Sequence, residues 1–189
     1  DILNQLTALA GYLDLIREES ENPKIHTYVD AEKRITETIR RQIQFTKDYQ
    51  EIGVQSPQWY DVKRTIEKAR INLPLLKDTL MISLENLSIY ADPLLEKVFY
   101  NLIENALRHG NGVSRITFSS RIQGDTITIV CQDNGKGMPE PYKEAIFNRQ
   151  HFENTGFGLF LSREILGITG LSIRETGKPG KGGRFEITV

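Results

Sequence analysis

The sequence predicts an α+β protein in two parts, an N-terminal helical hairpin at 1–52 and an α/β sandwich at 59–189. Three observations predict this class. Apolar residues recur in three- and four-residue steps over the first part, as on one face of a helix. A polar segment with Gly, Ser and Pro follows and reads as a linker at 53–58, a hinge between the parts. Beyond it, strand and helix patterns are interspersed, as in one sheet packed against helices.

The hairpin is predicted from two apolar stripes separated by the helix-breaking segment E-E-S-E-N-P. The first stripe contains Ile2, Leu6, Leu9, Leu13 and Ile16, and the second contains Val29, Ile35, Ile39 and Ile43. A two-helix hairpin has little core of its own, so a homodimer that forms a four-helix bundle is the simplest way to bury both stripes. The alternative is a hairpin docked on its own globular domain.

The globular part is predicted to begin with a helix from Asp61 to about Asn72, followed by strands at 80–84 and 88–90. A long helix should then open at Asp92-Pro93, with Asp92 as its cap and Pro93 in the first turn. Strands at 115–122 and 126–131 alternate around Q-G-D, the segment 157–170 is helical, and strands at 171–176 and 184–189 complete the sheet.

The long helix carries two amides, Asn101 and Asn105, and residues four apart on a helix lie on one face. An amide oxygen is a hard, neutral ligand that suits a magnesium ion held mainly by substrate phosphates. Arg108, one turn further on, adds a fixed cation for phosphate oxygens. For any one of these residues alone, a solvated helix face is the competing interpretation.

Asp133 follows an alternating strand and begins the turn D-N-G-K-G. Its carboxylate can accept a hydrogen bond from an exocyclic amine, so it is a candidate for adenine recognition, while Gly135 and Gly137 allow the backbone to approach the base. An ordinary D-N-G hairpin turn is the alternative. The segment T-G-F-G-L-F-L, with Gly156 and Gly158, is a glycine-rich entry to an apolar helix whose free N–H groups would face an anion.

In this order, the three segments resemble the sensor histidine kinases. N-L-I-E-N-A-L-R-H looks like their N box, D-N-G-K-G like the first glycine box and G-F-G-L like the second. Phe147 and Phe152 lie where the family has aromatic residues beside the lid over ATP. The terminal G-K-G-G-R-F-E-I-T-V is similar to the family's closing strand, with Gly183 where Thr or Ser is usual. The resemblance covers most of 59–189 and implies the ATP-binding fold shared with gyrase, MutL and the large heat-shock chaperones.

The start of the chain, D-I-L-N-Q-L, resembles the family's H box without its first residue, the phospho-accepting His. The resemblance makes Asp1 the acid that would make this His more nucleophilic, and Asn4 the residue that orients water in the reverse reaction. Gln5 stands where the family has Pro, so the first helix need not kink there. The histidines present do not follow the acceptor pattern: His26 and His151 are expected to be exposed or capping, and His109 to lie near the nucleotide.

The resemblance implies ATP-dependent autophosphorylation of a His and transfer to the Asp of a response regulator, which would dock near residues 1–16. ATP and Mg²⁺ are the implied cofactors: Asn105 would hold the metal, and Asn101 would also take a catalytic role, orienting phosphates together with Arg108. The implied nucleotide-binding residues are Asn101, Asn105, Arg108, His109, Asp133, Gly135, Gly137, Phe147, Gly156, Gly158 and Leu159.

Two other functions remain open, an ATPase clamp and a dimer scaffold that binds nucleotide without catalysis. The clamp enzymes of the superfamily carry Glu where this chain has Asn101, and an amide cannot act as a general base. Glu104 is adjacent to Asn105 and is expected to point to a different face of the helix.

Composition sets limits on function. A formal net charge of −1 over 189 residues gives no electrostatic argument for nucleic acid. The apolar stretches are shorter than the roughly 18 residues of a membrane span, so the domain is expected to be cytoplasmic, with any membrane anchor in regions outside this sequence. The single Cys131 excludes an internal disulfide and is expected in the core.

Overall fold

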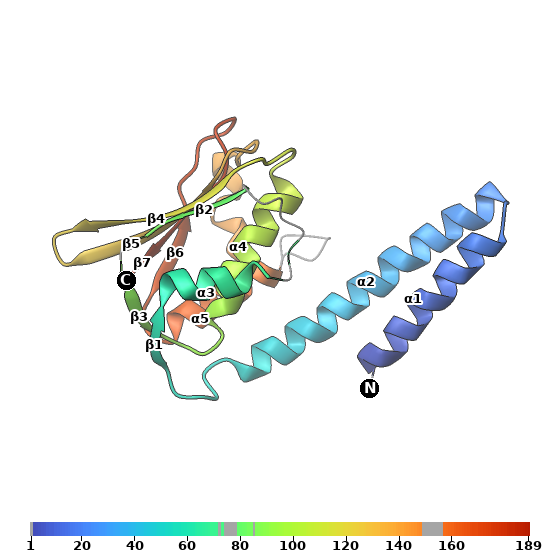
Figure 1. The fold of residues 1–189 in the computed structure, drawn as a ribbon, viewed down its shortest axis with the longest axis horizontal. Helices are drawn as coiled ribbons and strands as arrows, with labels where there is room; N and C mark the ends of the chain where they lie inside the picture. Colours follow the sequence, from blue (N-terminus) through green and yellow to red (C-terminus); the bar gives the residue numbers. More distant parts are fainter. Residues whose placement is uncertain (1, 72, 74–78, 85, 149–156) are drawn as a thin grey trace. The chain divides into compact units, whose positions relative to one another are not determined.

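The structure is a computed structural model, and it describes all residues except 1, 72, 74–78, 85 and 149–156. Contacts divide the chain into two compact units, Asp1–Tyr49 and Gln50–Val189. Figure 1 shows the helices of the first unit and the mixed strands and helices of the second. The prediction of an α+β chain, with helices first and a mixed α/β domain after them, is confirmed.

The first unit is a pair of helices, α1 (Ile2–Glu19) and α2 (Pro23–Glu51), the last two residues of α2 belonging to the second unit. Asn22 caps the N-terminus of α2. Its Oδ1 accepts a hydrogen bond from the N–H of Lys24 at 3.0 Å, and Pro23 takes the first helical position. His26 bonds through Nε2 to the carbonyls of Ser20 (2.5 Å) and Arg17 (3.1 Å), at the end of α1. The expected capping role of His26 is therefore confirmed.

Only part of each apolar stripe is buried within one hairpin. Leu6 and Leu13 of α1 and Val29 of α2 are buried, whereas Leu9 and Ile35 of the same stripes are exposed. Ion pairs join the helices at Arg17–Asp30 (2.5 Å) and between Lys33 and Asp14. The hairpin therefore keeps a large apolar surface that nothing within the unit covers.

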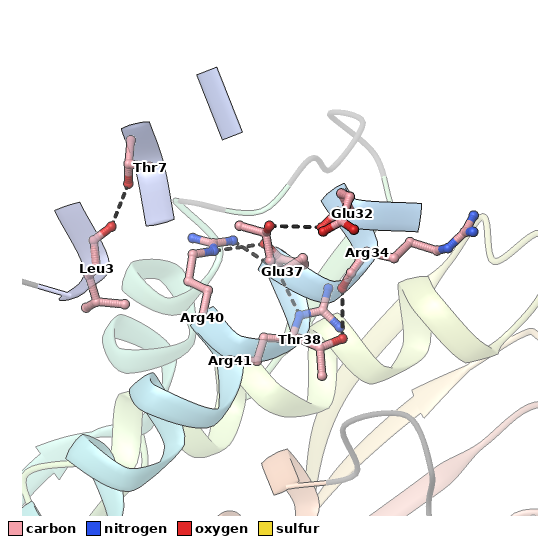
Figure 2. A network of polar contacts seen from close by, with 9 residues as sticks. Leu3, Thr7, Glu32, Arg34, Glu37, Thr38, Arg40 and Arg41 are labelled. Atoms are coloured by element: carbon pink, nitrogen blue, oxygen red, sulfur yellow. Dashed lines mark hydrogen bonds and ion pairs between the residues drawn. The ribbon is translucent and has the colours of Figure 1, made fainter. Parts of the chain in front are cut away.

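A charged network lies along α2 (Figure 2). The Glu37 carboxylate accepts from Arg40 at 2.8 and 3.0 Å and from Arg41 at 2.8 Å. Partial burial opposes ionisation of Glu37, but the two guanidinium groups outweigh it and hold the pKa of this carboxyl below its ordinary value. The network therefore stabilises α2 through contacts three and four residues apart.

The second unit contains a five-stranded sheet in the order β2-β4-β5-β7-β6 and a two-stranded sheet of β1 and β3. The strands are β1 (Gln58–Asp61), β2 (Leu80–Ser83), β3 (Ser88–Ala91), β4 (Ile116–Gln123), β5 (Thr126–Asp133), β6 (Ser172–Glu175) and β7 (Arg184–Thr188). Only the β2–β4 pair is parallel among the strand pairs described. β1 was not predicted, because its four residues run from the end of the expected linker at 58 to the expected start of a helix at Asp61.

The described part of the unit also contains three α-helices and two short 3₁₀ turns: α3 (Val62–Ala69), α4 (Leu95–His109), α5 (Phe157–Gly167), η1 (Glu140–Tyr142) and η2 (Ala145–Phe147). The three helices lie together against the large sheet (Figure 1). Phe99 of α4 meets Phe118 of β4 edge to face at 5.8 Å, and Phe147 of η2 meets Phe185 of β7 at 6.3 Å. These contacts lie in the core between the helical layer and the sheet.

The alternation of the strands places Asp133 on the side of the core. Cys131 pairs with Phe118 and with Phe185 in the ladder, and all three are buried. Since side chains on a strand repeat every two residues, Asp133 projects to the same face as Cys131. The prediction that Cys131 is a core residue is confirmed, and burial raises the pKa of its thiol well above the ordinary value.

The start of α4 differs from the prediction. Asp92 and Pro93 were expected in the cap and first turn, but the helix begins at Leu95, and Leu94 makes no side-chain cap bond. Asp92 instead holds a preceding turn, since its Oδ1 accepts from Leu94 N (2.8 Å) and its Oδ2 from Gly53 N (2.9 Å). Asp92 makes the long-range bond to Gly53 because its side chain is buried and each carboxylate oxygen needs a hydrogen-bond partner.

Candidate nucleotide site

A cavity of about 310 Å³ opens in the second unit between α4, the ends of β5 and β7, and the start of α5. The residues that line it are Asn101, Glu104, Asn105, Arg108, His109, Gly110, Asp133, Lys136, Gly137, Met138, Pro139, Tyr142, Ile146, Gly158, Leu159, Glu175, Gly183 and Phe185. Segments separated by up to 84 residues in the sequence thus contribute to one site. Its size is in the range of small-ligand pockets.

One wall is formed by α4, which contributes both predicted amides. Asn101 and Asn105 line the same cavity, as their spacing predicted, and Arg108 and His109 follow on the last turn. Glu104 also lines the cavity, so the expectation that it faces elsewhere was wrong. Adjacent residues on a helix differ by only about 100°, and a wide cavity admits both directions.

Asn101 and Asn105 differ in what they contact. Asn101 is 5% exposed, and its Nδ2 donates to Gly158 O at 2.8 Å and to Ser162 Oγ at 3.2 Å. A Cβ on Gly158 would lie 3.2 Å from Asn101 Cγ, so a side chain at 158 would require the Asn101 side chain to shift slightly. Asn101 therefore ties α4 to the first turn of α5, while Asn105 lines the cavity one turn further along α4.

Asp133 is the last residue of β5, at the strand end where the sequence placed it. Its Oδ1 accepts two backbone N–H groups, from Gly135 at 2.7 Å and from Gly183 at 3.1 Å. Two bonds to one oxygen fix the carboxylate and leave Oδ2 for another donor. The segment after Asp133 leaves the sheet instead of turning back, so the alternative of a D-N-G hairpin is excluded.

The glycines of this region permit close backbone contacts. A Cβ on Gly135 would lie 2.3 Å from Gly110 O, and the next N–H, that of Lys136, donates to the same carbonyl at 2.9 Å. Gly137 has φ +65, and a Cβ there would meet Lys178 O at 2.6 Å. Gly135 packs the loop against the end of α4 and does not itself line the cavity, whereas Gly137 does.

The remaining predicted residues fall into four groups. Gly158 and Leu159, in the first turn of α5, line the cavity, and the N–H groups of a first turn lack partners within the helix. Phe147 is 1% exposed and outside the lining, where it packs on Phe185 and under the Arg163 guanidinium at 4.2 Å. Asp1, His151, Phe152 and Gly156 lie outside the described residues, and Asn4 is an exposed residue of α1 in the first unit.

Glu175 is a second buried acid in the cavity wall that sequence reasoning missed. Its Oε1 accepts from Gly177 N (3.0 Å) and Arg184 N (3.1 Å), and its Oε2 has Lys143 Nζ at 3.6 Å. A hydrogen bond to Glu140 and the charge of Glu175 hold the pKa of Lys143 above its ordinary value. Glu175 could have been identified in the same way as Asp133, because it is also an acidic residue at the end of a predicted strand.

The apolar part of the lining was also missed by the motifs. Met138, Ile146 and Phe185 contribute side chains suited to a flat base. Met138 directly follows the first glycine box, so its place was open to prediction, whereas Ile146 and Phe185 reach the cavity only through tertiary packing.

Residues 91–189 match the family described as histidine kinase-, DNA gyrase B-, and HSP90-like ATPase. The chain belongs to this family. The curated relatives it resembles are sensor kinases. It is 28% identical over 195 residues to the alginate biosynthesis sensor protein KinB of Pseudomonas aeruginosa, covering 94% of this chain and 32% of KinB. It is 26% identical over 200 residues to the signal transduction histidine-protein kinase AtoS of Escherichia coli K12, covering 100% of this chain and 33% of AtoS.

Solved histidine kinases share the ATPase fold. The catalytic domain of ThkA covers 71% of this chain and 95% of its own, with TM-score 0.61 and 20% identity. The Acinetobacter baumannii histidine kinase AdeS covers 97% of this chain and 93% of its own, with TM-score 0.63 and 18% identity. The sensor-kinase resemblance of the sequence, with an ATP-binding domain of this family, is thereby confirmed. The chain spans about a third of KinB and AtoS.

None of the helices in the described part of the chain is both long and apolar enough to cross a membrane.

Proposed function

We propose that this chain is the core of a sensor histidine kinase. In this proposal the second unit binds ATP, and the γ-phosphoryl group is transferred to a His that stands immediately before Asp1 at the start of the hairpin. The observation that carries the proposal is the convergence of Asp133, Asn105 and the first turn of α5 on one cavity in the ATPase domain.

In this proposal the base binds against Asp133. The open Oδ2 accepts a hydrogen bond from the exocyclic amine of adenine, and Met138, Ile146 and Phe185 contact the ring. The carboxylate needs no rearrangement to do so, because its other oxygen is already held by two backbone N–H groups.

The phosphates bind along α4 and the start of α5. Arg108 and Lys136 supply positive charge, and the first-turn N–H groups of α5 supply donors. Asn105 fits a magnesium ion, since its amide oxygen is a hard ligand, and no cluster of acidic, His or Cys side chains in the described ranges offers a stronger protein site. When bound, the metal neutralises charge on the transferring phosphoryl group.

The site favours transfer to a protein side chain over transfer to water. A general base must accept a proton, and Asn101 is an amide whose nitrogen already donates to Gly158 and Ser162. One observation favours the alternative, an ATPase clamp: Glu104 lines the cavity and carries a carboxylate that could orient water.

The hairpin is proposed as the dimerisation and phosphoacceptor domain. Ile2, Leu9 and Ile16 are 58%, 44% and 46% exposed and are spaced seven residues apart, the repeat of a packed helical bundle. A second copy would cover them. Asp1 would then accept a proton from the preceding His, and Asn4 would orient water for dephosphorylation. A response regulator would dock beside α1 and accept the phosphoryl group on Asp.

The test uses the chain extended by one His before Asp1, incubated with Mg²⁺ and γ-labelled ATP. Acid-labile, alkali-stable label on the protein is expected. The 1–189 chain without that His should stay unlabelled because it has no acceptor. The extended chain with Asn105→Ala should stay unlabelled because it has lost the amide ligand of the metal.

The other outcomes identify the alternatives. Steady phosphate release without protein label, abolished by Glu104→Gln, would establish the ATPase clamp. Bound ATP with neither label nor release would leave a nucleotide-dependent scaffold.

A further inference from the structure

Glu175 is a buried acid whose two carboxylate oxygens have different partners. Oε1 accepts the N–H groups of Gly177 and Arg184, which fixes the connection between β6 and β7. Oε2 is also buried, and no described residue makes a hydrogen bond to it. An amide oxygen can accept the two bonds that Oε1 accepts, so this capping role does not require a charge. The negative charge of Glu175 therefore serves Oε2 and its surroundings.

The cation beside Oε2 is Lys143. Its Nζ lies 3.6 Å from Glu175 Oε2, too far for a hydrogen bond but close enough for an ion pair. Nζ also contacts Gly177 O at 2.8 Å and Glu140 Oε2 at 2.7 Å. The side chain of Glu175 is 1% exposed and that of Glu140 is 83% exposed. Because water screens the exposed pair, Glu175 is the stronger electrostatic partner of Lys143.

This ion pair joins two parts of the second unit that are far apart in the sequence. Lys143 stands between η1 and η2, whereas Glu175 is the last residue of β6. Tyr142 and Ile146, on either side of Lys143, line the cavity, while Lys143 itself lies outside the lining. Lys143 thus holds a wall of the cavity without being a ligand contact.

The pair is satisfied only while that wall is in place. A buried charge that loses its counterion is strongly unfavourable, and Oε2 is shielded from water. Movement of the η1–η2 segment away from β6 would leave Oε2 without Lys143. The ion pair therefore favours the arrangement in which Tyr142 and Ile146 line the cavity.

We propose that Glu175 and Lys143 are positioning residues of the nucleotide site. Their ion pair holds the wall formed by Tyr142 and Ile146 in place before a ligand arrives. It strengthens the binding of nucleotides that pack on this wall by the same factor, whatever their number of phosphates. This inference rests on the proposed function, because it requires the cavity to bind a nucleotide.

The test measures the dissociation constants of ATP and ADP by calorimetry with Mg²⁺, using the 1–189 chain, Glu175→Gln, Lys143→Met and the double variant. Glu175→Gln retains an oxygen for the two backbone N–H groups and loses only the charge. Each single variant should weaken ATP and ADP binding equally, by about threefold to tenfold. The double variant should lose no more than either single variant, because the two residues act as a pair.

Glu140→Gln is the matched control, because it removes the exposed carboxylate that contacts the same Nζ; it should bind both nucleotides like the original chain. Circular dichroism establishes that each variant is folded. If Lys143→Met does not fold, Lys143→Gln takes its place.

Unchanged affinity in Glu175→Gln would overturn this inference alone, as would losses that add in the double variant. A much larger loss for ATP than for ADP in Lys143→Met would also overturn it, because Lys143 would then be a phosphate contact. Failure of the original chain to bind ATP would overturn the proposed function as well.

Discussion

At the scale of single residues, Asp133 combines a fixed and an open oxygen in one carboxylate. Oδ1 is held by Gly135 and Gly183, so Oδ2 is already oriented when a ligand arrives. Such preorganisation lowers the entropy lost on binding. Glu175 repeats the arrangement at the end of β6, with Oε1 held by two N–H groups, but its second oxygen faces Lys143 at 3.6 Å.

Asp133→Asn should weaken ATP binding by about tenfold to a hundredfold. The variant loses a charge-assisted hydrogen bond worth roughly 1.5–3 kcal/mol, and its amide N–H group can face the amine of adenine, which is also a donor. Calorimetric titration measures the effect. Asp125→Asn, in the exposed turn between β4 and β5, is the control and should bind ATP like the original chain. Equal affinities for both variants would remove Asp133 from base recognition.

Cys131 should be unreactive in the folded protein. Its side chain is 3% exposed, and burial keeps the thiol protonated by raising its pKa. Ellman's reagent at pH 8 should therefore label the chain only after unfolding in guanidinium chloride. Rapid labelling of the native chain at that pH would contradict the burial of β5 in the core.

At the scale of elements, the bond from Asn101 couples two helices that both contribute to the cavity. Asn101→Asp would place a carboxylate against the Gly158 carbonyl, where the amide now donates at 2.8 Å. We expect a loss of about 1–3 kcal/mol in the free energy of unfolding, the usual cost of a buried polar group without its partner.

Urea unfolding of the 1–189 chain measures this cost. Asn105→Asp, the same change one turn along α4 at a residue that is only half-buried, is the control and should cost far less. Similar losses in the two variants would show that the α4–α5 bond contributes no more than the helix surface does.

Glu37 should make the stability of the hairpin depend on pH. The arginines lower the pKa of Glu37 in the folded state, so its contribution is present above the ordinary value of 4.5 and disappears as the pH falls through the lower folded-state value. For this partly exposed group the contribution is about 0.5 kcal/mol. Glu37→Gln should therefore be less stable than the original chain at pH 7, and urea unfolding should show this difference shrinking as the pH falls below 4.5.

Glu32→Gln is the control for that comparison, because Glu32 is exposed on the same helix and joins the network through its backbone carbonyl, which Thr36 contacts. A Glu32→Gln effect at pH 7 as large as that of Glu37→Gln would show a general loss of charge, not the arginine contacts, as the cause.

At the scale of the whole molecule, the exposed stripe of α1 predicts that the chain is a dimer. Leu9→Glu places a charge in the middle of that stripe, which is solvated in a monomer but desolvated in a four-helix bundle. Light scattering after gel filtration should give twice the chain mass of 21.6 kDa for the original chain and a single mass for the variant.

Gln5→Glu, at an exposed polar position of the same helix, should remain dimeric and is the control. A monomeric original chain would refute the dimer proposal, while a dimeric Leu9→Glu variant would move the interface to another surface.

Much of the site was predictable because its residues stand at positions that local structure defines. Asn101 and Asn105 share a face through helical periodicity, and Asp133 ends a strand that its alternation identifies. The sandwich followed in the same way from strand and helix periods. Capping was less predictable: Asp92 bonds to Gly53, 39 residues away, and no local pattern contains that partner.

The sequence by itself determined most of the elements, their order and the family, since hydrophobic period and motif order are properties of short segments. Only the tertiary structure decided which motif residues face the cavity and which support it. Asn101 donates to Gly158 across 57 residues, Phe147 packs into the core, and Glu175 reaches the cavity wall through the pairing of β6 with β7. These roles depend on contacts between distant segments, which form only when the chain closes around its core.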